Sequence, residues 1–470
     1  MLDIVICAIP PLERKYPLIG PAILKAVLND NGFKAKYVDF NIEYWNTVGS
    51  KEYFRTVDNI TENILDIDEQ CIDAWANQLI ETNPTWIGIS LFSYKQIPVA
   101  RKLLHKIKQK SNIKTVIGGA HISIGVTFIK ELQENNLIDA FISGDAEETL
   151  VELLQNNTSR ANVFKPVQLQ DMNQIPIPDY SDLDLDMYED NGILLVTGSR
   201  GCVKNCTFCN IATIWPTYRF RTGISVASEL EYLNQTHGID KFYFTDSLIN
   251  GSMKAMRDWC HNIIEKNMNI KWWGQFICRP EHQMTANDYD ILKQSGYSRA
   301  IIGVESGSTI VREHMTKTFT DQDLFTMLKE LVQRNIDIDI LMMVGYPTET
   351  EEDFQMSLQM IQTIHDQIKM NPEYTGTYNI TVNNPAVIIH STPLHQWATN
   401  NNIELKLNPD NVLSYDWEYG ENTEQVRIQR YLKFDDTVKE LQLEGAARWL
   451  TNGLQRKLLN YQQHNMINNT

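Results

Sequence analysis

Residues 1–155 alternate between strand-like and helix-like segments, and this alternation constrains the fold more than any other feature of the sequence. Short apolar runs rich in β-branched residues predict strands, and the amphipathic stretches between them predict helices. The predicted strands span 2–9, 34–40, 85–92, 113–119 and 138–144, and the clearest helices span 20–32, 97–110 and 126–136. Such an order is typical of an α/β fold, in which helices cover both faces of a parallel sheet. The acidic and aromatic segment 41–68 fits neither period, and we interpret it as an insertion.

A second alternating series occupies residues 191–395. Its predicted strands span 192–198, 241–246, 270–277, 299–305, 336–345 and 377–384, and its clearest helices span 225–235, 323–335 and 350–367. Six such units predict a partial (β/α)6 barrel of the TIM type, whose functional groups gather at the carboxyl ends of the strands.

Two further segments complete the predicted domain organisation. Residues 156–190 are rich in Pro and Asp and lack helical periodicity, so they predict a linker between the domains 1–155 and 191–395. The extension 396–470 is partly amphipathic, most clearly over 435–463, and we expect it to be mostly helical and to pack as a lid or buttress.

The composition limits where the chain works and what it binds. The formal net charge is −17, which argues against a broad nucleic-acid-binding surface because such surfaces need clustered Lys and Arg. No apolar run reaches the ~18 residues that a transmembrane helix needs. The first residues, MLDIVICAIPPLERKYP, lack the basic start of a secretory signal. We therefore expect a cytoplasmic protein without a transmembrane segment or a nucleic-acid partner.

Three of the seven cysteines lie within eight residues, directly after the predicted strand 192–198. In the segment GCVKNCTFC, Cys202, Cys206 and Cys209 are spaced so that their thiolates can serve one metal centre. A structural zinc site would need a fourth Cys or His, and the next cysteine, Cys260, lies in a predicted helix far along the chain. Three thiolates would leave one iron of an iron–sulfur cluster open to an external ligand. A structural zinc is the alternative.

The segment GCVKNCTFC resembles the CxxxCxxC signature of radical S-adenosylmethionine enzymes, including an aromatic residue, Phe208, before the last cysteine. The resemblance implies that the cysteines hold a [4Fe–4S] cluster and that S-adenosylmethionine chelates its fourth iron. It also implies that the reduced cluster cleaves the sulfonium and so produces a 5′-deoxyadenosyl radical, which abstracts hydrogen from the substrate.

Later segments resemble other signatures of this family in the expected order, namely FTDS (244–247), CRP (278–280), GVESGS (303–308), GYPTETEEDF (345–354) and STPLH (391–395). The resemblance implies that S-adenosylmethionine contacts Phe208, Asp246, Arg279, Gly303, Glu305 and Gly345. Arg279 would pair with the methionyl carboxylate, whereas Asp246 or Glu305 would accept from the amine or the ribose. Structural roles are open alternatives: Asp246 can cap the following helix, and Glu305 can pair with a nearby arginine.

The N-terminal domain resembles the Rossmann-like, flavodoxin-ordered cobalamin-binding domain of the B12-dependent radical S-adenosylmethionine class. The segments 16–41, 88–95, 117–123 and 142–154 carry this resemblance, whereas no GxGxxG that would indicate a dinucleotide follows the first strand. The implied cobalamin contacts are Leu12, Ser90, Phe92, Gly118, Gly119, His121 and Gly144. The Asp-x-His-x-x-Gly motif that supplies an axial histidine in other cobalamin proteins is missing. A loop hydrogen bond therefore explains His121 better than a bond to cobalt.

The resemblance implies cobalamin-dependent C-methylation of an unactivated carbon, with an external electron donor such as flavodoxin or ferredoxin. Ring contraction or cyclisation is an alternative outcome of the same cofactors. Another alternative is a radical enzyme whose N-terminal domain has lost cobalamin, and a third is a non-catalytic corrinoid-binding protein with a structural metal. The substrate, whether a small molecule, a lipid or a peptide, is not encoded in any motif.

Overall fold

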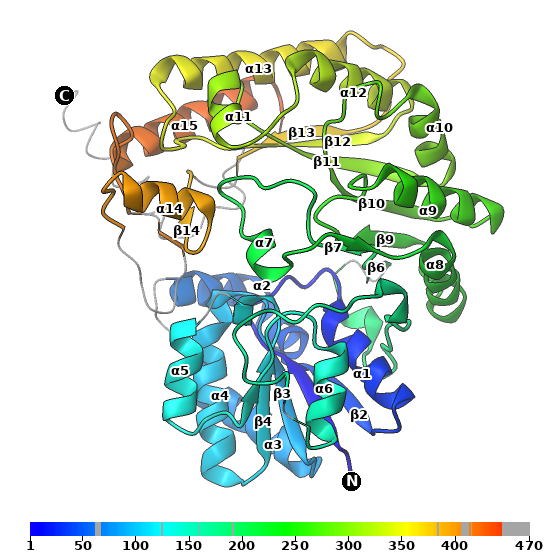
Figure 1. Cartoon of the computed structure of the whole chain (residues 1–470), viewed down its shortest axis with the longest axis vertical. Coiled ribbons are helices and arrows are strands. Elements are labelled where there is room, and N and C mark those ends of the chain that lie inside the picture. The colour runs from blue at the N-terminus through cyan, green and yellow to red at the C-terminus, as the bar shows by residue number, and fades with distance from the viewer. Residues whose placement is uncertain are drawn as a thin grey trace. The chain divides into compact units, whose positions relative to one another are not determined.

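The computed structural model describes residues 1–61, 67–123, 126–157, 159–189, 192–382, 385–405, 413–414 and 416–443 (Figure 1). The chain divides into two compact units. The first contains Met1–Leu195 and Thr213–Pro216, and the second contains Val196–Ala212 and the described residues from Thr217 onward.

The first unit is built on a five-stranded parallel sheet with the strand order β2-β1-β3-β4-β5. This is the flavodoxin-like order, so the predicted fold is confirmed. Each strand falls inside a segment predicted from the sequence; the strands are β1 (Ile4–Ala8), β2 (Ala35–Asp39), β3 (Trp86–Ser90), β4 (Lys114–Gly118) and β5 (Ala140–Phe141).

Helices cover both faces of this sheet, because side chains alternate between the two faces of a strand. One apolar cluster joins Ile4 and Ile6 of β1 to residues of α1 and α6, and the other joins Val5 and Cys7 to residues of α2 to α5. The helices are α1 (Ile19–Asp30), α2 (Phe40–Thr61), α3 (Glu69–Glu81), α4 (Ile97–Lys110), α5 (Val126–Glu134) and α6 (Glu147–Leu154).

The segment 41–68, interpreted as an insertion because it fits neither period, contains most of helix α2. Gly49 interrupts the helix with a φ of 75° and a ψ of 166°. The kink shifts the apolar positions on its two sides relative to each other, which explains why no single helical period is visible. The part of the segment at 62–66 lies outside the described residues.

Residues 159–189, which belong to the segment that the sequence predicts to be a linker, are part of the first unit and are bonded to its sheet. The Asp182 carboxylate accepts a hydrogen bond from the Tyr37 amide at 2.9 Å, and the Tyr188 hydroxyl donates to Asp39 at 2.7 Å. Because β2 is an edge strand, these contacts satisfy backbone and side-chain groups that would otherwise be open to pairing.

The second unit contains a six-stranded sheet with the order β13-β12-β11-β10-β9-β6, and its pairings from β9 to β13 are parallel. This arrangement confirms the predicted partial barrel. The strands are β6 (Ile193–Val196), β9 (Lys241–Phe244), β10 (Lys271–Phe276), β11 (Tyr297–Glu305), β12 (Asp337–Met342) and β13 (Tyr378–Thr381).

Helices follow the strands of this sheet and form its outer layer (Figure 1). They are α8 (Gly223–His237), α9 (Met253–Glu265), α10 (Ala286–Gln294), α12 (Asp321–Gln333) and α13 (Glu351–Lys369). Shorter elements lie near the strand ends: β7 (Ser199–Arg200), α7 (Ile211–Ile214), β8 (Arg219–Phe220), α11 (Thr309–His314), β14 (Ile388–Ile389), α14 (Pro393–Asn400) and β15 (Leu413–Ser414).

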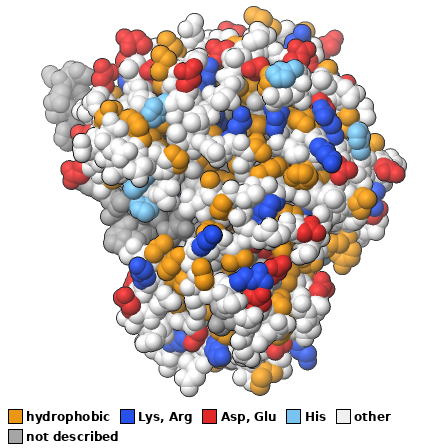
Figure 2. Space-filling model, viewed as in Figure 1, with side chains coloured by type: hydrophobic (Ala, Val, Ile, Leu, Met, Phe, Trp, Pro, Cys, Tyr) orange, Lys and Arg blue, Asp and Glu red, His pale blue; other side chains and the backbone are white. Residues whose placement is uncertain are grey.

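The C-terminal extension contains helix α15 (Glu424–Glu440), which packs against α13 of the barrel. The rest of the amphipathic stretch predicted at 435–463 lies outside the described residues from 444 onward. In the part of the chain that the structure describes, no helix is long and apolar enough to cross a bilayer. On the face drawn in Figure 2, Lys and Arg side chains are interspersed with Asp and Glu.

Candidate functional site

The three clustered cysteines lie in a loop that follows β6, at the carboxyl end of the barrel strand. The antiparallel pairing of β7 with β8 closes the base of this loop. All three thiols are partly buried, and burial raises the pKa of each one, to about 11 for Cys209. Thiols of this kind ionise when a metal binds them, because the metal replaces the proton.

The three free cysteines form a donor set that fits an iron–sulfur cluster. Among the described residues, no three His, Cys, Asp or Glu side chains are arranged to hold one metal ion. A zinc site needs its ligands to converge on one ion, whereas in a [4Fe–4S] cluster each cysteine binds its own iron. Three thiolates fit such a cluster, because its remaining iron can take a ligand from outside the protein.

The segment 314–318 holds the cysteine loop in place. The Lys204 ammonium donates to the Thr318 hydroxyl at 2.9 Å, and the Thr316 hydroxyl donates to the Asn205 carbonyl at 2.7 Å. The Thr207 amide donates to the Met315 carbonyl at 3.2 Å. The loop is thus fixed on both sides of Cys206. The sequence does not reveal this segment, because its contacts join residues more than 100 positions apart.

Lys317 and Glu305 form a largely buried ion pair of 3.0 Å beside the cysteines. Burial would lower the pKa of Lys317, but the charges of Glu305 and Cys206 outweigh it and raise that pKa, so the ammonium stays protonated at neutral pH. The ammonium also lies 6.0 Å from the centre of the Phe208 ring. The predicted residues Glu305 and Phe208 therefore meet around a cation that the sequence analysis did not identify.

Asp246 is buried, and structural partners occupy both of its carboxylate oxygens. One oxygen accepts from the Gly198 amide at 2.9 Å, and the other accepts from the Ser199 hydroxyl. Burial raises the pKa of Asp246 to about 7, although these hydrogen bonds oppose the rise. The carboxyl group thus fixes the chain just before the cysteine loop. This role is structural, as is the helix cap that the sequence offers as an alternative for Asp246.

Arg279 is likewise bonded to its own surroundings. Its guanidinium donates to the carbonyl oxygens of Asn250 and Gly251 at 2.7 and 2.6 Å and to the Gln283 side chain at 2.9 Å. These contacts fix the end of β10 and leave little of the planar fork for a carboxylate.

The predicted glycines of the second unit lie close to neighbouring side chains. A Cβ atom on Gly303 would lie 2.4 Å from a Glu305 oxygen and 3.0 Å from the Lys317 nitrogen. A Cβ atom on Gly345 would lie 2.5 Å from the Arg427 side chain of α15. In both cases the absent side chain makes room for the protein's own charged groups.

The seven residues predicted to contact cobalamin lie in the first unit, at or just after the carboxyl ends of β1, β3, β4 and β5. The Leu91 amide donates to the Gly118 carbonyl at 2.7 Å, and the His121 amide donates to the Leu91 carbonyl at 3.1 Å. These bonds bring Ser90, Gly118 and their neighbours together. Phe92 is 61% exposed, which leaves an aromatic face open at this edge.

Gln96 forms hydrogen bonds at the same edge of the sheet, and no motif in the sequence marks it. Its buried side-chain amide donates to the Ile9 carbonyl at 2.6 Å and accepts from the Phe92 amide at 2.7 Å. It thereby joins the ends of β1 and β3. Leu12 is held separately, by a hydrogen bond of 2.9 Å from its amide to the Asn41 side chain.

Two of the three predicted glycines at this edge are needed because a neighbouring backbone segment passes too close for a side chain. A Cβ atom on Gly119 would lie 2.4 Å from the Leu91 carbonyl oxygen, and one on Gly144 would lie 2.2 Å from that of Val167. A Cβ atom on Gly118 would meet only the Ile142 carbonyl oxygen, at 3.9 Å. Gly118 is therefore the one of these three at which a Cβ atom would make only an ordinary van der Waals contact.

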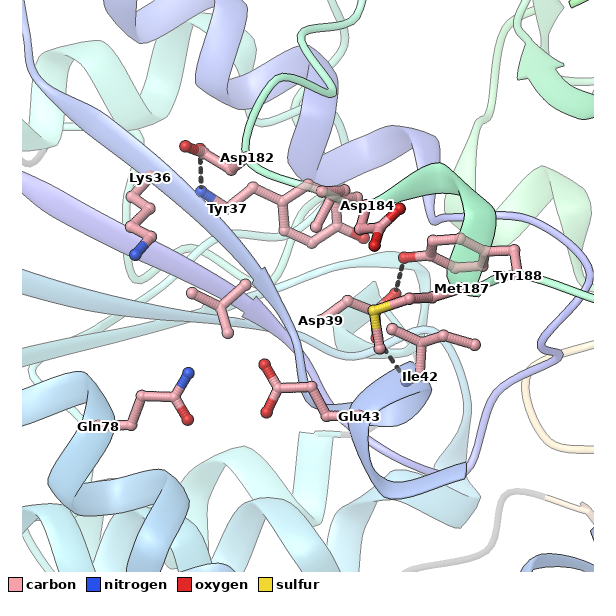
Figure 3. A pocket seen from close by; sticks show the side chains of 12 residues that line it. Lys36, Tyr37, Asp39, Ile42, Glu43, Gln78, Asp182, Asp184, Met187 and Tyr188 are labelled. Atoms are coloured by element: carbon pink, nitrogen blue, oxygen red, sulfur yellow. Dashed lines mark hydrogen bonds between the residues drawn. The ribbon is translucent and has the colours of Figure 1, made fainter. Parts of the chain in front are cut away.

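A pocket of about 200 Å³ lies elsewhere in the first unit, along β2 (Figure 3). Its lining includes the carboxylates of Asp39, Glu43, Asp182 and Asp184 but none of the residues predicted to contact cobalamin. Burial raises the pKa of Asp39 to about 6, and its oxygens already accept hydrogen bonds from Tyr188 and from backbone amides. The pocket is thus a consequence of the way residues 182–188 lie along the edge strand.

Comparison with known proteins identifies both domains. The profile of the B12 binding domain matches residues 11–154, and that of the Radical SAM superfamily matches residues 196–361. An uncharacterised methyltransferase of Pyrococcus horikoshii is 26% identical over 57% of this chain and 62% of its own. An anaerobic magnesium-protoporphyrin IX monomethyl ester cyclase of Synechocystis is 25% identical over 57% of this chain and 58% of its own. The chain spans between 50% and 62% of the length of the first four curated relatives.

Solved structures share the fold. The radical S-adenosylmethionine methyltransferase TsrM from Kitasatospora setae, with cobalamin and a [4Fe–4S] cluster bound, superposes with a TM-score of 0.62 at 15% identity, covering 85% of this chain and 79% of TsrM. The cobalamin-dependent radical enzyme OxsB, with aqua-cobalamin and S-adenosylmethionine bound, gives a TM-score of 0.68 at 14% identity, covering 92% of this chain and 66% of OxsB.

These matches confirm the resemblance seen in the motifs. The cofactors of the chain are a [4Fe–4S] cluster and S-adenosylmethionine in the radical domain and cobalamin in the B12-binding domain. The chain belongs to the radical S-adenosylmethionine enzymes that carry an N-terminal B12-binding domain.

Proposed function

We propose that the chain is a cobalamin-dependent radical S-adenosylmethionine methyltransferase that methylates an unactivated carbon. The observation that carries this proposal is the pairing of an incomplete cysteine site, at the end of β6, with a B12-binding domain in one chain. When bound, the cofactors supply reductive cleavage of the sulfonium, hydrogen abstraction from the substrate and a methyl group. The protein supplies positions, charge and exclusion of water.

In this proposal Cys202, Cys206 and Cys209 hold the cluster, and Lys317 supplies the positive charge for the methionyl carboxylate. Lys317 is favoured over Arg279 because its charge acts on Cys206 and Cys209, whereas the Arg279 guanidinium is bonded to carbonyl groups. Glu305 and Phe208, which lie around Lys317, stay proposed contacts of S-adenosylmethionine.

Cobalamin is proposed to bind at the carboxyl ends of β1, β3, β4 and β5, where ligands of open α/β sheets bind. The exposed ring of Phe92 supports this edge, as does Gly118, where the protein itself makes no close contact with the position of a Cβ atom. We also propose that the chain works in the cytoplasm and takes electrons from a small carrier such as flavodoxin or ferredoxin, because free cysteines and an iron–sulfur cluster need reducing conditions.

The experiment is an anaerobic assay of the reconstituted protein, with S-adenosylmethionine carrying a deuterated methyl group, in extract of the host. Methyl transfer predicts a metabolite that gains the labelled methyl, together with 5′-deoxyadenosine. The Cys206→Ala variant, which cannot hold the complete cluster, is the negative control, and Cys260→Ala, which alters a buried core cysteine, is the matched positive control.

Ring closure is the second candidate, because three of the first four curated relatives are cyclases. It predicts 5′-deoxyadenosine and a product that has lost hydrogen without gaining label. Absence of 5′-deoxyadenosine from the wild-type reaction would contradict both candidates.

A further inference from the structure

Three residues in or beside the cysteine loop form a closed ring of hydrogen bonds, which includes one backbone carbonyl. Thr207 lies between Cys206 and Phe208, His314 ends helix α11, and Tyr346 lies in the loop after β12. The Tyr346 hydroxyl lies 2.8 Å from the Thr207 hydroxyl and 2.9 Å from Nδ1 of His314. The Thr207 hydroxyl in turn lies 3.2 Å from the His314 carbonyl oxygen.

The direction of each hydrogen bond in this ring follows from the chemistry of its members. A carbonyl oxygen only accepts, so the single proton of Thr207 points to the His314 carbonyl. Thr207 must then accept from Tyr346, which uses the only proton of the tyrosine. Nδ1 of His314 must therefore carry a proton and donate to Tyr346. Burial lowers the pKa of His314, so its imidazole is neutral near pH 7 and carries its one N–H proton at Nδ1.

The surroundings allow Tyr346 little freedom to leave this arrangement. The residue is 1% exposed, and its partner His314 packs in a T-shaped arrangement against Trp397, with the ring centroids 5.0 Å apart. The Tyr346 amide donates to the Glu349 carboxylate at 3.1 Å, and its carbonyl accepts from the Asn422 side chain at 3.1 Å. The backbone of this residue is thus fixed at one end and its hydroxyl at the other.

We propose that Tyr346 is a positioning residue that couples the loop after β12 to the cysteine loop. This inference rests on the proposed function and on the S-adenosylmethionine contact at Gly345, in the loop after β12, that the family resemblance implies. The tyrosine belongs to the first loop through its backbone, whereas its hydroxyl fixes Thr207 and therefore the course of the chain between Cys206 and Cys209. Both loops must keep their relative position for one ligand to bind at the cluster and at Gly345 together.

The test compares S-adenosylmethionine binding in the reconstituted wild-type protein and the Tyr346→Phe variant. The phenylalanine keeps the buried ring and removes only the hydroxyl. Because it breaks two hydrogen bonds while the cysteines remain, we expect full iron and sulfide content but about tenfold weaker binding of S-adenosylmethionine. We also expect S-adenosylmethionine to change the electron paramagnetic resonance spectrum of the reduced cluster less in the variant than in the wild type.

The matched control is Tyr378→Phe. Tyr378 makes the same kind of bond, 3.0 Å from its hydroxyl to Nδ1 of His365, but on β13 and without contact to the cysteine loop. We expect this variant to bind S-adenosylmethionine like the wild type. Equal loss of binding in the two variants would overturn the inference.

The Thr207→Val variant removes the partner hydroxyl at constant shape. It should match Tyr346→Phe, and the double variant should lose little more than either one, because all three disrupt the same ring. Full additivity, or wild-type affinity and spectrum in Tyr346→Phe, would overturn the inference. If Tyr346→Phe does not fold, Thr207→Val decides in its place. A wild-type protein that assembles no cluster would instead refute the proposed function itself.

Discussion

The Lys317 ammonium lies 3.0 Å from the Glu305 carboxylate and donates a hydrogen bond of 2.8 Å to the Gly303 carbonyl oxygen. Glu305 has a φ of 70°, in the left-handed region that side-chain-bearing residues rarely adopt, at a shift in the register between β11 and β12. The ion pair therefore holds a strained strand end beside the cysteine loop. Such strain persists only where surrounding contacts determine the conformation.

Replacing Lys317 by Met should destabilise the second unit. The change leaves the Glu305 carboxylate largely buried without its cation, and the loss of one partner of such a pair costs about 3 kcal/mol of the free energy of unfolding. Chemical denaturation of wild type and variant measures this loss. Arg299→Met is the control. Arg299 lies on β11, as Glu305 does, but its side chain is 40% exposed and pairs with Asp337 at 3.3 Å. Its expected cost is below about 1 kcal/mol, so similar losses in the two variants would contradict the prediction.

Alanine should lower the stability of the protein at Gly119, whereas at Gly118 it should weaken cobalamin binding without changing stability. Gly119 has a φ of 108°, and a Cβ atom there would lie 2.4 Å from the Leu91 carbonyl oxygen, so Gly119→Ala should lower stability by about 2 kcal/mol or more. Gly118→Ala meets no close atom and should leave stability unchanged. If cobalamin binds at this edge, Gly118→Ala should nevertheless retain less cobalt after gel filtration. Unchanged cobalamin retention in Gly118→Ala would argue for a different binding edge.

The strands of the two main sheets could be predicted because each lies in a short apolar run of the sequence. Strand β12, for example, was predicted at 336–345 and spans Asp337–Met342. The cysteine loop was predictable for the same reason, since its ligands are adjacent in the chain. The helix around Gly49 was not, because one residue with positive φ shifts the helical period.

Contacts between distant segments explain what the sequence could not reveal at the site. Lys317 reaches Glu305 only because α11 turns the chain back toward the end of β11. The type of a residue likewise does not show whether its hydrogen-bond donors or acceptors already have partners within the protein. Asp246 and Arg279 have suitable chemistry for a ligand, yet both are bonded to their own backbone surroundings.

Asp246→Asn should change how stability depends on pH. Burial raises the pKa of Asp246 to about 7 in the folded protein, above its ordinary value of 3.8, so the folded state holds a proton that the unfolded state has lost. The free energy of unfolding that this group contributes therefore falls as pH rises from about 4 to about 7 and is constant above that, with a total of at most about 4 kcal/mol. Asparagine does not titrate, and the Ser199 hydroxyl can turn to accept from its amide.

Urea unfolding at several pH values measures this effect as the difference between the two proteins. We expect the variant to gain stability relative to the wild type as pH rises from 5 to 7, by a few kcal/mol at most. The comparison removes the contributions of Asp39 and Glu349, which are common to both proteins. A difference that does not vary with pH would show that Asp246 is already ionised at pH 5 in the folded state.

We expect Arg430 to make the main polar contacts that fix helix α15 to the barrel. Its side chain is 3% exposed. Its guanidinium donates to the Glu349 carbonyl at 3.1 Å and to the Asn422 side chain at 2.7 Å. Burial raises the pKa of the Glu349 carboxyl to about 7, and Arg430 opposes that rise. The same carboxylate accepts from the amides of Gly345 and Tyr346, so it links the helix to the loop after β12.

Arg430→Gln should therefore cost about 3 kcal/mol, because it leaves the Glu349 carboxylate buried without a cation. The loop after β12 should loosen with it, which faster hydrogen exchange at the Gly345 and Tyr346 amides would report. Lys439→Gln on the same helix is the control: its side chain is 54% exposed beside Asp435, and its loss should cost less than about 1 kcal/mol. If Arg430→Gln loses stability while these two amides keep their protection, the helix supports the barrel by some route other than the Glu349 carboxylate.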